Sequence, residues 1–452
     1  MLPLMSDQRR QAGLWLSTLI LFAINILNFY DRTVPAALVE PMRKEFGLND
    51  TQIGLLTSAF IWFYAIVGLP LGLIADRWSR KKLLAWGVVV WTALTASTGL
   101  ATTYAFLFFS RIGVGLGEAA CAPTATSWLG DLFPANQRSR VLALFMMGVP
   151  IGGALGYFFG GPIAQAYGWR AAMVSAALPG LLLVPALLIL REPERGASEP
   201  SDRTTFRRHE ALATTSIWNI LRIPTLWWII ASGALLNFCA YVFATFLPAF
   251  LTRVHGLSVA NSGKAAGTLY LLGGVLGGVL SGRVGDYVVH RGKDGRMLCA
   301  AVMALITVPL ACIGILQPRG SLLLATVFLG LMYVSLSSYY GFVYSAIQDF
   351  VAPNQRASTM AIYFMAMYIC GASFGPLLTG KLSDLLAHRA AAAAGSSVVT
   401  EVFRAVGLQR AMLVIPVLSV ALAFVLYMGS RTIVADAERR QSITEGVLAT
   451  SD

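Results

Sequence analysis

Gly72-Leu-Ile-Ala-Asp76-Arg77-Trp-Ser-Arg80-Lys81-Lys82 is a short polar connection between two apolar runs, at residues 51–75 and 83–102. Each run has about the 20 residues that a helix needs to cross the hydrocarbon core of a bilayer. The connection carries four basic residues, and basic loops of this kind lie preferentially on the cytoplasmic side of a membrane. We therefore expect two antiparallel membrane helices joined by a cytoplasmic loop.

The composition of the whole chain also indicates a membrane protein. Of 452 residues, 56% are hydrophobic and 12% are charged, whereas soluble domains carry roughly 25% charged residues. The formal net charge is +12, but Lys and Arg lie in short clusters between apolar runs, so we expect no nucleic-acid partner. The five cysteines form no CxxC pair and no metal-type spacing, and we interpret them as packing residues.

Outward from the first connection, the chain contains twelve apolar runs of spanning length, six in each half. Those of the first half lie near residues 14–38, 51–75, 83–102, 104–130, 139–163 and 168–190, and those of the second near 226–252, 260–285, 297–317, 321–348, 357–386 and 408–430. The sequence therefore predicts an all-α integral membrane protein with twelve transmembrane helices. Its two six-helix bundles lie at residues 1–190 and 226–430, with a cytoplasmic linker at 191–225 and a cytoplasmic tail at 431–452.

The distribution of basic residues predicts the orientation. If the N-terminus is cytoplasmic, 22 of the 34 Lys and Arg residues fall on the cytoplasmic side and 10 on the opposite side, while Arg32 and Arg111 lie within spans. This bias places both termini and the linker in the cytoplasm.

The two halves carry the same loop signatures at equivalent places. Gly72-x-x-x-Asp76 follows the second span and recurs as Gly282-x-x-x-Asp286 after the eighth. Asp131 with Gln137-Arg138 follows the fourth span, and Asp349 with Gln355-Arg356 follows the tenth. Parallel repeats related by an axis along the membrane normal have this appearance, and a substrate would then bind between the halves.

These loop motifs resemble those of the major facilitator superfamily, with Ser79 where a glycine is usual. The resemblance covers the whole chain, because the number of spans, the repeat and both loop motifs agree. It implies a secondary transporter that works by alternating access.

Motifs in the first and fourth spans resemble those of the spinster-like lysolipid transporters. They are Asn28-Phe-Tyr30-Asp31-Arg32, Arg111-Ile-Gly-Val-Gly-Leu-Gly-Glu118-Ala and Gly130-Asp131-Leu-Phe-Pro134. This resemblance implies a proton-coupled transporter of a lysophospholipid or a sphingoid-phosphate-like lipid. An Asp-Arg pair and an Arg with a downstream Glu-Ala also occur in organic anion:cation symporters. A proton-coupled transporter of organic anions or drugs is therefore the alternative.

Four ionisable residues lie at membrane depth: Asp31, Arg32, Arg111 and Glu118. Such residues are costly in a bilayer and usually face a cavity or each other. Arg111 and Glu118 are seven residues apart, which places them on one face of the fourth span. Our hypothesis is that Asp31 and Glu118 are the proton-coupling acids. Arg111 would hold an anionic substrate group, together with Arg32, Asn28 and Tyr30 nearby.

Two simpler interpretations of these charges stay open. Asp31 and Arg32 could form a fixed buried ion pair, and Glu118 could form an internal brace with Arg111. In either case the acids would not titrate.

The loop residues are expected to form a cytoplasmic gate rather than a substrate site. They are Asp76, Arg77, Arg80, Lys81, Arg138, Asp286 and Arg356, and their charge pairs would have two arrangements that favour inward and outward states. Mutating them should change turnover more than specificity.

Polar residues of the second half are the remaining candidates for substrate binding. Asn237 and Tyr241 are four residues apart on the seventh span, and Tyr340 and Tyr344 on the tenth. Helical spacing puts each pair on one face, although tyrosines near span ends are also interfacial anchors. The charges are confined to the first half, a pattern that suits an amphipathic substrate with one charged group.

The remaining expectations concern chemistry and location. No Walker-type motif is present, so we expect no cofactor and an ion gradient as the energy source, with protons implied by the resemblance. No span holds a histidine at depth or a paired-acid metal motif, so we expect neither a catalytic nor a metal site, and no enzyme. We expect a monomer among the lipids of the plasma (inner) membrane.

Overall fold

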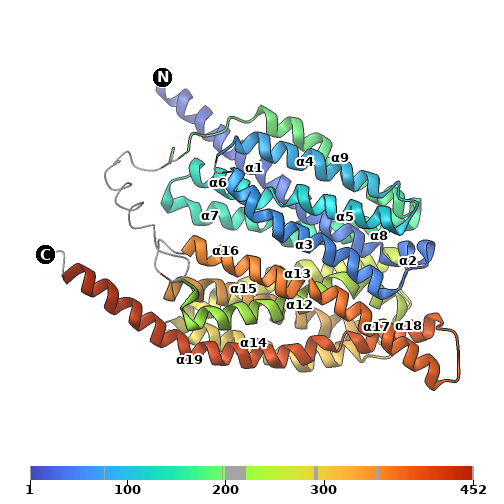
Figure 1. Ribbon diagram of the computed structural model, residues 1–452. Coiled ribbons are helices and arrows are strands. Elements are labelled where there is room, and N and C mark those ends of the chain that lie inside the picture. Colours follow the sequence, from blue (N-terminus) through green and yellow to red (C-terminus); the bar gives the residue numbers. More distant parts are fainter. Residues whose placement is uncertain are drawn as a thin grey trace. The chain divides into compact units, whose positions relative to one another are not determined.

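The computed structural model describes residues 2–75, 77–195, 197–198, 220–289, 294–351 and 356–449. All regular elements within these ranges are helices (Figure 1). They group into two compact units, here called unit 1 and unit 2. Residues 1–201 form most of unit 1, and two segments of the following helices, Thr245–Thr252 and Gly256–Leu271, group with it.

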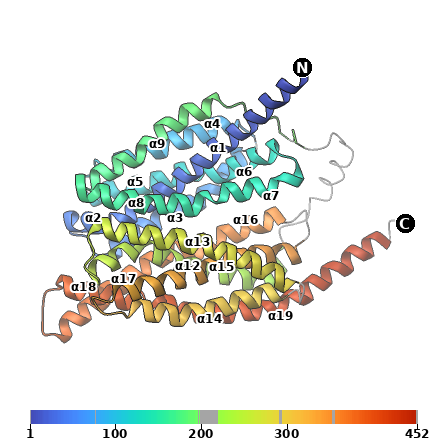
Figure 2. The same cartoon turned by 180° about the vertical axis from the view of Figure 1, so that it is seen from behind.

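Unit 1 contains the helices of the first half. They are α1 (Leu2–Ala37), α2 (Val39–Phe46), α3 (Asp50–Ala75), α4 (Arg80–Thr98), α5 (Tyr104–Glu118), α6 (Cys121–Leu132), α7 (Ala135–Met146), α8 (Gly148–Tyr167) and α9 (Trp169–Ile189). An apolar core of this unit includes the buried side chains of Val34, Leu107 and Met173 from α1, α5 and α9. Helix α4 packs on α5 and α9, and both views show α4 beside α9 (Figures 1 and 2).

Unit 2 contains most of the second half. Its helices are α12 (Pro224–Arg253), α13 (Val259–Val289), α14 (Gly295–Ile315), α15 (Leu322–Phe350), α16 (Arg356–Met367), α17 (Phe374–Ala393), α18 (Glu401–Ala411) and α19 (Val414–Ala449), with a π-helical turn, η2 (Tyr368–Ala372), between α16 and α17. Helix α14 lies between α15 and α19 in the packing of this unit. Helix α19 continues through most of the segment that we expected to be a tail.

Within the described ranges, eleven helical segments are long and apolar enough to cross a membrane. They correspond to eleven of the twelve predicted runs. The remaining run, 83–102, coincides with α4, a 19-residue helix that begins with Arg80, Lys81 and Lys82 and is not among the eleven. The all-helical architecture is as predicted, whereas the count of twelve spans stays a prediction.

Four of the predicted runs are interrupted rather than continuous. The interruptions lie at 119–120, 147, 368–373 and 412–413. Each ends three residues before a proline, namely Pro123, Pro150, Pro376 and Pro416. Proline has no N–H to donate to the carbonyl four residues earlier, so the helix weakens just before it. The first of these interruptions directly follows Glu118.

Glycines bring α8 against α1, which carries part of the candidate site. A Cβ atom at Gly152 would lie 2.2 Å from the carbonyl oxygen of Ile26, and one at Gly156 would lie 2.7 Å from that of Tyr30. Only glycine permits this approach. Small residues at membrane helix interfaces let two backbones approach in this way.

Candidate functional site

The four charges at membrane depth come together in unit 1. Asp31 and Arg32 lie near the end of α1, and Arg111 and Glu118 lie on α5. Asp31 and Glu118 are fully buried, and Arg111 is 5% exposed. Asp31 interacts electrostatically with both Glu118 and Arg111. Two carboxylates and two guanidinium groups therefore form one buried cluster.

The ion pair within this cluster joins two helices. The Nε atom of Arg32 donates to Oε2 of Glu118 over 2.8 Å. This pairing differs from both simpler interpretations, in which Arg32 would pair with its neighbour Asp31, and Glu118 with Arg111. A contact between α1 and α5 therefore depends on the charge of Glu118.

Aromatic rings surround the two guanidinium groups. The Cζ atom of Arg32 lies 4.2 Å from the ring centroid of Tyr64 and 4.6 Å from that of Phe29. Phe60 lies against both arginines, with centroid distances of 5.4 Å to Cζ of Arg32 and 4.9 Å to that of Arg111. Sequence reasoning missed Phe60 and Tyr64, although their spacing of four residues on the second span places them on one helix face.

Several buried polar atoms of the cluster have no hydrogen-bond partner among the described residues. They are both carboxylate oxygens of Asp31, Oε1 of Glu118, Nη1 of Arg111 and Nδ2 of Asn28. Buried polar groups are normally satisfied, so such a concentration marks a place where a proton, water or ligand completes the bonding. Tyr30 is half-buried and within electrostatic range of Asp31.

A tyrosine cluster lies in unit 2, on α12, α15, α16 and η2. The hydroxyl of Tyr339 is 2.7 Å from that of Ser232 and 3.2 Å from that of Tyr363. Tyr340 donates to Oδ1 of Asn237 over 3.1 Å. The polar atoms in this chain of contacts are therefore satisfied within the protein.

All four predicted residues of the second half belong to this cluster. The rings of Tyr340 and Tyr344 pack at 5.5 Å, and Tyr344 also packs against Tyr363 at 5.8 Å. Tyr241 packs against Tyr368 of η2 at 6.3 Å. Sequence reasoning missed three tyrosines of this cluster. Tyr339 was passed over in favour of its neighbour Tyr340, and Tyr363 and Tyr368 lie on the eleventh span, for which no site residue was predicted.

The predicted gate residue Arg80 lies in a dense network within unit 1. Its side chain is 1% exposed and forms ion pairs with Asp131 and with Glu192, whose Oε1 is 3.3 Å from Nε. Glu192 also accepts hydrogen bonds from the hydroxyl of Ser79 (2.6 Å) and the backbone N–H of Arg80 (2.8 Å). Burial alone would raise the pKa of Glu192, but these hydrogen bonds hold the pKa below its ordinary value. Sequence reasoning missed Glu192 because it lies in the polar stretch taken as a linker.

The other predicted gate residues are placed as follows. Lys81 donates to the carbonyls of Leu188 and Leu190, and Arg138 donates to those of Gly130 and Phe133. Arg77 and Asp286 are exposed. Asp76 lies outside the described residues, as does the side chain of Arg356.

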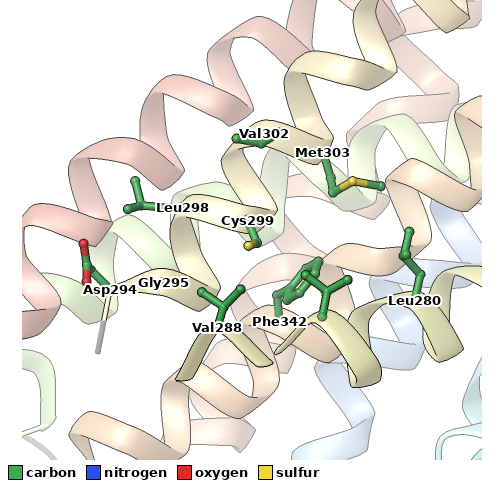
Figure 3. A pocket seen from close by; sticks show the side chains of 10 residues that line it. Leu280, Val288, Asp294, Gly295, Leu298, Cys299, Val302, Met303 and Phe342 are labelled. Atoms are coloured by element: carbon green, nitrogen blue, oxygen red, sulfur yellow. The ribbon is translucent and has the colours of Figure 1, made fainter. Parts of the chain in front are cut away.

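A separate cavity of about 440 Å³ lies in unit 2 between α13, α14 and α15 (Figure 3). Its lining is apolar apart from Asp294 at one end, and it contains none of the predicted site residues. In the described part of the chain, no group of three or more His, Cys, Asp or Glu side chains is arranged to hold a metal.

Comparison with known proteins places this architecture in a family. The model of the Major Facilitator Superfamily matches residues 21–376. An MFS-type efflux pump of Mycolicibacterium smegmatis is 29% identical over 386 residues, which make up 84% of this chain and 87% of the pump. Human protein spinster homolog 1 is 29% identical over 402 residues, covering 81% of this chain and 72% of the homolog.

A solved structure gives the same assignment. The crystal structure of a bacterial homolog to the human lysosomal transporter Spinster, in an inward-facing and unoccupied conformation, is similar with a TM-score of 0.84. The two chains are 27% identical, and the match covers 94% of this chain and 98% of that one. The predicted resemblance is therefore confirmed. The chain is a multi-pass membrane protein that belongs to the major facilitator superfamily and is related to the spinster-type transporters.

Proposed function

We propose that the protein is a proton-coupled secondary transporter that moves an amphipathic lipid by alternating access. The lipid would be of the lysophospholipid or sphingoid-phosphate type. One observation carries the proposal: Asp31 and Glu118 are fully buried beside two arginines, and only one of the two acids is hydrogen-bonded to a cation.

Protonation of such acids changes the net charge of the cluster. With all four groups ionised, the charges of two carboxylates and two guanidinium groups cancel. A proton on Glu118 weakens its bond to Arg32 and leaves a net positive charge, which favours an anionic ligand near Arg111. A bound anion would in turn favour proton uptake, so protons and substrate are coupled.

Charge and surface are divided between the units in a way that suits an amphipathic substrate. The arginines of unit 1 would hold the anionic headgroup. The tyrosine cluster of unit 2 supplies rings and hydroxyls, which suit the uncharged part of the molecule. Kinship to spinster-type proteins supports the lipid assignment.

A second candidate substrate class is a small organic anion or drug. The similarity to an MFS-type efflux pump over 84% of this chain favours it specifically. The scaffold, the acids and the proton coupling would be the same, and only the uncharged part of the substrate would differ.

Other features complete the proposal. Helix α4 would be the twelfth span, with both termini in the cytoplasm and residues 1–190 and 226–430 acting as two bundles around the substrate. Arg80 and its partners would form the cytoplasmic gate. The protein would act as a monomer in the plasma (inner) membrane without a cofactor.

Proton uptake on ligand addition tests this proposal. Purified protein in weakly buffered detergent is mixed with a lysophosphatidylcholine-type lipid, and a pH-sensitive dye reports protons. We expect a pH change with the wild type, and its loss in Asp31→Asn and in Glu118→Gln.

Two controls make the result specific. Glu401→Gln removes an acid whose side chain is 63% exposed, and it should respond as the wild type does. Detergent with lipid alone gives the background. A response to small organic acids but to no lysolipid would overturn the lipid assignment, and a response that survives both acid substitutions would overturn the role of the two acids.

A further inference from the structure

One aromatic ring lies against both buried arginines. Phe60 is 3% exposed, and its ring centroid is 5.4 Å from Cζ of Arg32 and 4.9 Å from Cζ of Arg111. The face of a benzene ring carries partial negative charge and attracts a cation within about 6 Å, most strongly where water is excluded. Among the described residues, Phe60 has the one aromatic ring that lies against both guanidinium groups.

The position of this ring is fixed by the backbone. A Cβ atom at Gly115 of α5 would lie 2.7 Å from the carbonyl oxygen of Phe60, so α3 and α5 meet closely at this point. The ring also stacks on Tyr64 with centroids 6.1 Å apart and an interplanar angle of 18°. The backbone of Phe60 therefore packs closely against α5, the helix that carries Arg111 and Glu118, while its ring reaches Arg32 on α1.

The charges in this cluster allow more than one pairing. Arg111 lies on the same helix as Glu118 and interacts with it electrostatically, yet the hydrogen bond to Glu118 comes from Arg32. The two guanidinium groups repel each other, and this repulsion is only weakly screened at a buried site. A shared ring attracts both and holds each at a defined position.

We propose that Phe60 is a positioning residue that fixes which arginine pairs with Glu118. The ring keeps Arg32 on Glu118 and holds Arg111 within reach of Asp31 and of an anionic ligand. Its effect on proton uptake rests on the proposed function, whereas its effect on stability does not.

Fluorinated phenylalanines test this proposal at nearly constant shape. Fluorine withdraws electrons from the ring, so one, two and three fluorines weaken the attraction to a cation stepwise. The analogues are introduced at position 60 by nonsense suppression. Phe246 of α12 is the control position, because it is also fully buried and no described residue places a guanidinium over its ring.

The first readout is thermal unfolding in detergent, which needs no substrate. We expect the unfolding temperature to fall with each fluorine at position 60 and to stay constant with fluorination at position 246. In an Arg32→Gln, Arg111→Gln background the dependence at position 60 should vanish. An equal fall in unfolding temperature per fluorine in the wild-type and the double-glutamine background would overturn the proposal, whatever the protein transports.

The second readout is lipid-induced proton uptake. Here we expect the apparent lipid affinity to fall about tenfold from phenylalanine to the trifluoro analogue. Phe60→Leu should lose at least as much, and Phe60→Trp should retain most of the response. A wild type that takes up no protons would count against the proposed function alone, since the unfolding series still decides the role of Phe60. Normal proton uptake by the trifluoro protein and by Phe60→Leu would contradict the positioning role.

Discussion

Asp31 in unit 1 and Tyr339 in unit 2 are both buried polar residues on membrane-spanning helices, but their surroundings differ. The hydroxyl of Tyr339 has two hydroxyl neighbours, Ser232 at 2.7 Å and Tyr363 at 3.2 Å. Neither oxygen of Asp31 has a hydrogen-bond partner among the described residues. The hydroxyls of Tyr339, Ser232 and Tyr363 thus satisfy one another, whereas the described residues leave both oxygens of Asp31 without a hydrogen bond.

This difference separates two kinds of polar residue in a membrane protein. A satisfied network holds its side chains in one arrangement, because every change breaks a bond in surroundings of low polarity. An unsatisfied set of charges has several arrangements of similar energy, and a proton can select among them. Under the proposed function, the charged cluster of unit 1 would act as a switch and the tyrosine cluster as a fixed surface.

The largest effect is expected from breaking the ion pair of unit 1. Arg32→Gln leaves the fully buried Glu118 without its hydrogen-bonded cation, and we expect a loss of about 3–5 kcal/mol in unfolding free energy. Glu118→Gln removes the carboxylate that Arg32→Gln leaves without its cation, so the double variant should recover part of this loss. Thermal or denaturant unfolding in detergent measures all three.

The surface pair of Arg404, which is 27% exposed, and Glu401, which is 63% exposed, supplies the matched control; their charged atoms are 3.9 Å apart. Arg404→Gln should cost less than about 1 kcal/mol, as is usual for surface pairs. Strictly additive losses for Arg32→Gln and Glu118→Gln would show that the two side chains do not interact, and the contrast between the units would then lose its basis.

A second test lies within unit 1, where Arg80 is buried but well partnered. Glu192→Gln weakens the hydrogen bonds from Ser79 and from the backbone and side chain of Arg80, and we expect a loss of about 2 kcal/mol at pH 7. The pKa of Glu192 is lowered in the folded protein, so its charge stabilises the fold above the ordinary value of 4.5.

The difference between wild type and Glu192→Gln should therefore be largest near neutral pH and close as the pH falls through the pKa of the folded state. Unfolding temperatures measured from pH 7 downward check this. A difference that grows on acidification would contradict the assignment of Glu192 as an ionised hydrogen-bond acceptor.

The smallest effect is expected in unit 2. Tyr339→Phe removes a hydroxyl that contacts Ser232 and Tyr363, and we expect a loss of about 1 kcal/mol. Tyr344→Phe is the matched control: its ring packs against Tyr363, but the described residues give its hydroxyl no hydrogen bond, so its effect should stay within about 0.5 kcal/mol. Neither variant should move the pH dependence of proton uptake, and a shift in either would remove the distinction between switch and surface.

Much of the fold could be predicted because a bilayer restricts what an apolar run can do. Length and composition alone located eleven segments that the structure confirms as long enough to span. The interruptions were missed because each run was interpreted by its mean apolarity, although Pro123, Pro150, Pro376 and Pro416 mark where backbone hydrogen bonds are lost. Helix α4 differs in another way: it was predicted as a span but is not among the eleven, and its basic first turn lowers its mean apolarity.

The candidate site could be predicted where charge is the signal. Asp31, Arg32, Arg111 and Glu118 stand out because ionisable residues are rare at membrane depth. Their pairing could not be predicted, since Arg32 and Glu118 are 86 residues apart and meet only through the packing of α1 on the following helices. Phe60 was missed for a related reason, because one phenylalanine in an apolar run is indistinguishable from a core residue until its neighbours are known.

The π-helical turn η2 has a consequence for helix phase. Four residues spaced by four, Tyr363, Met367, Gly371 and Gly375, all face α12, where they meet Gly233, Asn237, Ala234 and Phe238. In a regular helix of 3.6 residues per turn, a stripe with this spacing drifts by about 40° at each step, or about 120° over its length. The wider turn at Tyr368–Ala372 absorbs much of that drift. Removal of one residue from this turn would leave a continuous helix. It would, however, rotate Gly375 by about 100° away from Phe238, so α17 would separate from α12 at this contact.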